Sequence, residues 1–151
     1  MTSVSSSNDL ILCNFENAKY RKNLQEKTIQ IDKALDNIEI TELIIDCIQD
    51  IKGKNIVRLD LRELDDAPTD FFIVCEGESS TQINAIADNV VRRLKQEIGL
   101  RPSHTEGKQS ANWVLVDYFD IIVHVFYPET RSFYEIEDLW SDATQTEYEN
   151  I

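Results

Sequence analysis

Residues 112–127, with the sequence NWVLVDYFDIIVHVFY, contain the pattern that decides the fold. Two apolar runs flank a short turn at Tyr118 and Phe119, and both runs are rich in residues that favour strands. The segment therefore predicts a β-hairpin in which Asp117 pairs with Asp120 next to the turn. Counted outward from that pair, the partner of Trp113 would be His124.

The predicted hairpin has two faces of different chemistry, because neighbouring residues of a strand point to opposite sides. The first face is aliphatic and should pack into a core: Val114, Val116, Ile121, Val123 and Val125. The second face mixes rings with two carboxylates at its rim: Trp113, Leu115, Ile122, His124 and Phe126, with Asp117 and Asp120. This composition is typical of a protein interface. It also fits a second core layer around a histidine whose ring nitrogens are hydrogen-bonded. The pattern alone leaves both interpretations open.

The segments around the hairpin predict an α/β domain. Residues 79–98 carry one apolar stripe at helical spacing, with Ser79 and Gln82 as a capping box and Gly99 as the stop. The apolar run 70–75 predicts a strand buried on both faces. The other predicted elements are a helix over 41–52 with Thr41 as N-cap, a strand over 55–61, a short strand around 100–106 and a closing helix over 132–140.

This order of elements predicts an α/β fold with a mixed β-sheet of about five strands and flanking helices. We expect residues 1–38 to be a flexible extension with a transient helix from Ala18 onward, because their periodicity is weak. The folded domain should cover 39–141. An acidic tail is expected over 142–151.

Composition limits the function. The net charge is −13, and residues 41–140 contain 10 basic and 19 acidic side chains, so the folded part is acidic. Such a surface would repel phosphates and favours a basic protein partner, although negative charge also simply maintains solubility. We find no membrane-spanning stretch and no targeting segment, and the three cysteines contain no Cys-x-x-Cys pair. A cytoplasmic protein without a metal or cofactor is therefore expected.

An enzyme is the main alternative. The turn Gly77-Glu78-Ser79-Ser80 before a helix resembles a phosphate-binding turn, and Asp117 with Asp120 could hold metal ions, as in nucleotidyltransferases. Helix capping explains the serines equally well, and the two aspartates are three residues apart across a turn. We therefore expect no catalytic site.

Taken together, the motifs resemble the ribosomal silencing factor family, also called the Iojap family, from about Glu42 to Trp140. The matching segments, in order, are Leu59–Leu61, Thr69–Val74, Gly77–Ser80, Ile86–Val90, Gly99–Pro102, Glu106–Gly107, Trp113–Tyr118, Asp120–Phe126, Arg131, Tyr134 and Leu139–Trp140. The resemblance implies a nucleotidyltransferase-like core topology without its catalysis. It also implies that the protein binds ribosomal protein fourteen of the large subunit, blocks joining of the small subunit and represses translation when nutrients are scarce.

The resemblance further implies a homodimer, and a role in large-subunit assembly is the alternative to silencing. By motif position, the partner-binding residues would be Trp113, Leu115, Asp117, Asp120, His124, Phe126 and Tyr134. The chain departs from the family pattern at Thr81-Gln82, where an Arg-His pair is usual, and at Phe119, where glycine is common. A non-glycine residue fits poorly in a tight turn, so Phe119 predicts a wider loop and a register shifted by one.

Overall fold

The computed structural model describes residues 35–151, and residues 40–151 form a unit of their own. Most of the predicted extension, including the transient helix from Ala18, therefore lies outside the described residues. In chain order the elements are α2 (Asn37–Asp50), β1 (Lys54–Asp60), β2 (Phe71–Glu76), α3 (Ser80–Ile98), β3 (His104–Glu106), β4 (Trp113–Asp117), β5 (Ile121–Phe126), α4 (Pro128–Tyr134), α5 (Ile136–Leu139) and β6 (Thr144–Glu147).

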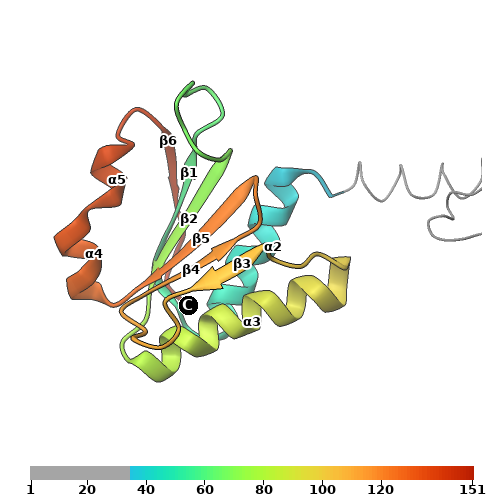
Figure 1. Ribbon diagram of the computed structural model, residues 1–151, viewed down its shortest axis with the longest axis vertical. Coiled ribbons are helices and arrows are strands. Elements are labelled where there is room, and N and C mark those ends of the chain that lie inside the picture. Colours follow the sequence, from blue (N-terminus) through green and yellow to red (C-terminus); the bar gives the residue numbers. More distant parts are fainter. Residues whose placement is uncertain (1–34) are drawn as a thin grey trace, which may run out of the picture. The chain divides into compact units, whose positions relative to one another are not determined.

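The strands form one six-stranded sheet in the order β3-β4-β5-β2-β1-β6 (Figure 1). β2 and β5 are parallel, and the other neighbouring pairs are antiparallel. The predicted α/β fold with a mixed sheet is thus confirmed. The sixth strand, β6, was not predicted: it lies in the expected acidic tail and pairs with β1 along the edge of the sheet.

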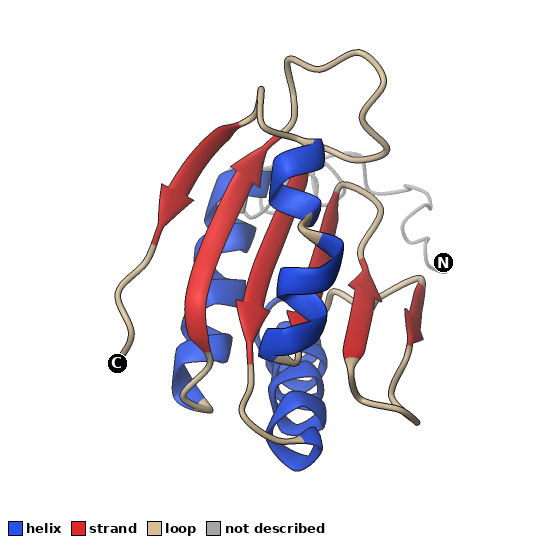
Figure 2. Cartoon of the chain, turned by 90° about the vertical axis from the view of Figure 1, so that its left-hand side faces the viewer, coloured by secondary structure: helices blue, strands red, loops and turns tan. Residues whose placement is uncertain are grey.

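Helices cover the two faces of the sheet unequally. The longer helices α2 and α3 pack on one face, whereas the short α4 and α5 lie over the other (Figure 2). The central strand β2 is buried from Phe71 to Cys75, as its uninterrupted apolar sequence predicts. The strands between the two layers therefore contribute side chains to two separate apolar clusters.

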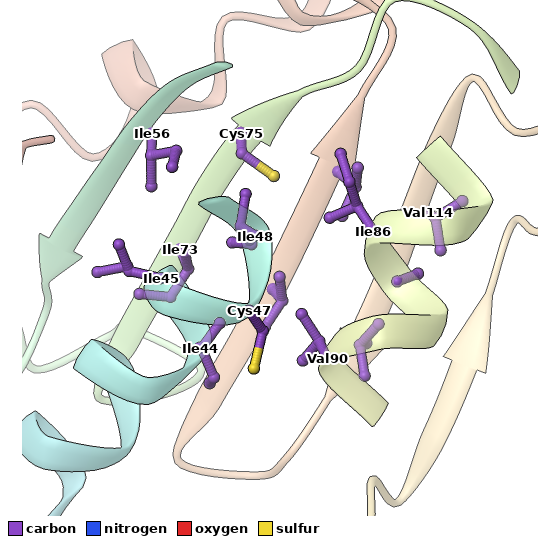
Figure 3. Packing of buried hydrophobic residues seen from close by; sticks show 14 of the residues in the cluster. Ile44, Ile45, Cys47, Ile48, Ile56, Ile73, Cys75, Ile86, Val90 and Val114 are labelled. Carbon is purple, nitrogen blue, oxygen red and sulfur yellow. The ribbon is translucent and has the colours of Figure 1, made fainter. Parts of the chain in front are cut away.

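The larger cluster lies between the sheet and α2 and α3 (Figure 3). All five residues of the predicted aliphatic hairpin face belong to it, and Val114, Val116, Val123 and Val125 are fully buried. Cys47 and Cys75 are free thiols in the same cluster. Burial raises the pKa of both thiols to about 12, so they are protonated and unreactive at neutral pH.

The predicted register of the hairpin was wrong by two residues. Trp113 pairs with Phe126 and Asp117 with Ile122, so the turn is formed by Phe119 and Asp120. Both faces keep their predicted members because a shift of two leaves every side chain on its side. The wider loop and the one-residue shift expected from Phe119 are wrong as well, because the turn stays tight. Phe119 adopts a φ of 70°, and its N–H donates to Asp117 Oδ1 at 2.7 Å. This hydrogen bond helps a non-glycine residue to occupy the left-handed region.

The limits of α3 are as predicted, and Gln82 does more than cap the helix. The Ser79 side chain accepts the Gln82 N–H, and Gly99 ends α3 in the left-handed conformation. The Gln82 carboxamide accepts the Glu78 N–H at 2.7 Å and donates to the Ile51 carbonyl at 2.9 Å. This departure from the family pattern therefore ties the start of α3 to the segment after α2.

Two other helix predictions need correction. α2 begins four residues before Thr41, because Asp36 and Glu39 form a reciprocal capping box; Thr41 is instead buried within the helix. The closing helix begins at Pro128 rather than 132 and is broken into α4 and α5 at Glu135, whose φ is 47°. The short strand predicted around 100–106 is limited to β3.

Candidate functional site

Six rings gather where α4 and α5 meet the sheet, and we call them the aromatic cluster: Phe72, Trp113, His124, Phe126, Tyr134 and Trp140. Trp113 is central, with its ring centroid 4.8 Å from Phe126 and 5.0 Å from Tyr134. His124 meets Phe72 edge to face at 4.6 Å. The structure thus brings together four of the predicted site residues: Trp113, His124, Phe126 and Tyr134.

His124 fixes the orientation of the Trp113 ring. The indole Nε1–H donates to His124 Nδ1 at 3.0 Å, and an indole nitrogen can only donate. Nδ1 must therefore be unprotonated, which places the proton of the neutral imidazole on Nε2. Burial lowers the pKa of His124 to about 4 and keeps this neutral form at physiological pH.

The predicted site residues differ in accessibility. His124 and Phe126 are buried beneath the surface, whereas Trp113 and Leu115 are half-buried and Tyr134 is 50% exposed. Two further apolar side chains, Phe133 at 77% and Leu139 at 75%, protrude from α4 and α5. Sequence reasoning missed them because helices of seven and four residues are too short to show a periodic pattern.

Asp117 and Asp120 lie apart from the aromatic cluster. Trp113 and Asp117 are the first and last residues of β4, so they lie roughly 13 Å apart at the usual rise of a strand. Asp117 holds the turn through Phe119, and its Oδ2 is 3.7 Å from His104 Nδ1, while Asp120 is exposed. The predicted surface therefore has an aromatic end and an acidic end.

The two features that suggested an enzyme are far apart. The turn at Gly77 follows β2, whereas Asp120 precedes β5, and these two strands are parallel. The turn and the aspartates thus lie at opposite ends of six paired residues, roughly 20 Å apart. Within residues 35–151, His, Cys, Asp and Glu side chains nowhere group in a way that could hold a metal ion. Over the same residues, the helices lack the length and apolar character needed to cross a bilayer.

A largely buried arginine anchors α4 to the sheet. The Arg131 guanidinium donates to the Asn55 carbonyl at 2.7 Å, to Glu76 Oε2 at 2.9 Å and to Glu137 Oε2 at 2.6 Å. These partners come from the start of β1, the end of β2 and α5. Arg131 therefore fixes the short helices that present Phe133 and Tyr134.

The loop before β4 places Trp113 at the edge of a groove. Gly107 has a φ of 88° and lies so close to the Trp113 carbonyl that a β-carbon would collide with it. The groove has a volume of about 450 Å³ and is lined by Ser110, Asn112, Trp113, Glu129, Thr130, Phe133 and Tyr134. We call it the Trp113 groove.

Comparisons with known proteins agree with the resemblance seen in the sequence. Residues 34–151 match the family described as "Ribosomal silencing factor during starvation". The ribosomal silencing factor RsfS of Halalkalibacterium halodurans is 35% identical over 117 residues, covering 78% of this chain and 98% of that protein. The protein of the same name from Chromobacterium violaceum is 44% identical over 105 residues, covering 68% of this chain and 82% of its own length.

A crystal structure supports the same assignment. A protein from Chromobacterium violaceum superimposes with a TM-score of 0.67 at 40% identity, covering 70% of this chain and 87% of that one. The family match over residues 34–151 includes the whole aromatic cluster. This chain belongs to the ribosomal silencing factor family.

Proposed function

We propose that this protein binds ribosomal protein fourteen of the large ribosomal subunit and blocks joining of the small subunit. By this action it would repress translation under nutrient limitation. Family membership supports ribosome silencing. The main observation in favour of this binding surface is the exposed aromatic end of the sheet. There, Phe133 and Tyr134 protrude beside Trp113 on a protein with a net charge of −13.

The predicted contact residues divide into two groups. Trp113, Leu115 and Tyr134 are accessible and would touch the partner directly. His124 and Phe126 are buried and would contribute indirectly, because they hold the Trp113 ring in place. Interfaces commonly concentrate their binding energy in a few rigid aromatic side chains of this kind.

Asp117 and Asp120 would form an acidic rim at the other end of the surface. Their negative charge would speed the encounter with a basic protein. The same charge would disfavour contact with the phosphates of the RNA that surrounds such a protein in the ribosome. The affinity should therefore fall as salt increases. Binding that is independent of salt would contradict a role for these carboxylates.

Co-sedimentation with isolated ribosomal subunits tests the proposal. The protein should sediment with large subunits and not with small ones, and it should lower the yield of joined ribosomes when added before the small subunit. If the protein binds large subunits but leaves joining unaffected, steric silencing is wrong. Accumulation of large-subunit precursors in cells without the protein would favour the assembly role instead.

Two further parts of the proposal have separate tests. We infer a homodimer, which sedimentation equilibrium would detect as twice the monomer mass of 17.5 kDa. We also infer a cytoplasmic location, which fractionation of cells would check. A monomer at all accessible concentrations would contradict the first inference without affecting the ribosome-binding surface.

A further inference from the structure

The Trp113 groove combines aromatic walls with one acidic group. Three of its seven lining residues are aromatic, Glu129 is the one charged residue among them, and Ser110, Asn112 and Thr130 add neutral polar groups. The Tyr134 ring is tilted by 47° from Trp113 and by 87° from Phe133. The three rings therefore present faces in different directions.

Glu129 is unpaired, unlike two other glutamates near α4, Glu76 and Glu137. Glu76 and Glu137 are both bound to Arg131. Glu129 is exposed and forms no hydrogen bond or ion pair with residues 35–151. It lies four residues before Phe133 in α4, so both side chains project from the same side of the helix. A free carboxylate thus lies beside an exposed ring at the groove.

We propose that the Trp113 groove holds an arginine side chain of the protein that binds this surface. A guanidinium stacks on aromatic faces while its N–H groups reach a carboxylate, and Trp113, Tyr134 and Glu129 supply both partners. The net charge of −13 also draws a basic side chain toward the groove. The inference rests on the proposed function, because it names the side chain that anchors the partner.

A peptide titration tests the groove without the ribosome. The full chain, labelled with ¹⁵N, is titrated with capped Gly-Arg-Gly, and the indole N–H signals of Trp113 and Trp140 are followed by NMR. The Trp113 signal should shift, whereas capped Gly-norleucine-Gly should leave it in place. Equal shifts with the two peptides would overturn a cationic site. Equal binding of Gly-Lys-Gly would overturn the preference for arginine.

A substitution tests the groove on the ribosome. Glu129→Gln keeps the shape of the side chain and should weaken binding to isolated large subunits by roughly tenfold. Glu63→Gln is the matched control, because Glu63 is an exposed glutamate in the loop after β1, away from the groove lining. It removes the same charge and should have little effect.

The two tests separate failure of this inference from failure of the proposed function. If wild type binds large subunits and Glu129→Gln binds equally well, the arginine anchor is wrong and the proposed function stands. If wild type does not bind large subunits, the proposed function is wrong. In that case the peptide titration still decides whether the groove takes an arginine.

Discussion

The two faces of the sheet differ in how completely they are covered. The face toward α2 and α3 is aliphatic, and the residues that β4 and β5 contribute to it are almost entirely buried. The opposite face carries the aromatic cluster under two short helices, and Trp113, Leu115 and Tyr134 remain partly accessible. One face therefore stabilises the fold, whereas the other combines stability with an accessible surface.

The sharpest difference should appear when equivalent apolar contacts are removed from the two faces. Ile86 is fully buried on α3, so Ile86→Ala should lower the free energy of unfolding by about 4 kcal/mol. Phe133 is 77% exposed, so Phe133→Ala should lower it by less than about 0.5 kcal/mol. Urea denaturation of the two variants measures both values. Similar losses would show that Phe133 is part of the core rather than of an accessible surface.

The second expected effect concerns the anchor of the aromatic face. Arg131→Met would leave Glu76 and Glu137, whose side chains are 17% and 23% exposed, without their cation. We expect a loss of about 3 kcal/mol in the free energy of unfolding, because breaking a buried ion pair leaves charge uncompensated. Thermal or urea denaturation would measure this loss.

An exposed ion pair provides the control for Arg131. The Lys108–Asp88 pair has side chains that are 44% and 62% exposed, so Lys108→Met should cost less than about 1 kcal/mol. If Arg131→Met is equally mild, Arg131 does not anchor α4. Packing of Ile136 and its apolar neighbours would then hold the short helices.

The third and smallest effect is the pH dependence of stability that His124 of the aromatic cluster causes. Burial lowers the pKa of His124 from 6.5 to about 4. Between these two pH values the imidazole is mostly protonated in the unfolded chain and mostly neutral in the folded chain. The stability contributed by neutral His124 is complete above pH 6.5 and is lost as the pH falls toward 4. Between pH 8 and pH 5 this group alone should lower stability by about 2 kcal/mol.

Comparison with His124→Gln isolates this contribution from that of the carboxylates. Glutamine is not protonated in this range and can still accept a hydrogen bond from Trp113. The variant should therefore lose about 2 kcal/mol less than wild type between pH 8 and pH 5. Identical pH profiles would mean that His124 is accessible to protons in the folded state.

The local features that the sequence predicted correctly are those fixed by neighbouring residues. The apolar stripe from Ile83 to Leu94, the Ser79 cap and the alternation in 113–126 each depend on short spacings, and each is present as predicted. The two hairpin faces have their predicted members although the predicted register was wrong, because a shift of two residues leaves each side chain on the same face. Local pattern thus determined which residues share a face.

The features that the sequence did not predict depend on distant contacts. β6 is polar and acquires its conformation by pairing with β1, whose paired residues lie 84 to 90 positions earlier in the chain. The Arg131 anchor joins α4 to Asn55 and Glu76, which no local spacing reveals. Burial of His124 follows from α4 and α5 lying over the sheet. The sequence and the family resemblance therefore predicted four members of the aromatic cluster, Trp113, His124, Phe126 and Tyr134, but not which of them are accessible.

The most direct test of the central claim is the affinity of Trp113→Ala for isolated large subunits. Trp140→Ala is the control, because Trp140 is also a half-buried tryptophan of the aromatic cluster but lies outside the Trp113 groove. With both variants folded by circular dichroism, Trp113→Ala should lose binding at least tenfold and Trp140→Ala should bind nearly as wild type. Binding of Trp113→Ala at the wild-type level, or an equal loss in both variants, would contradict the assignment of this surface.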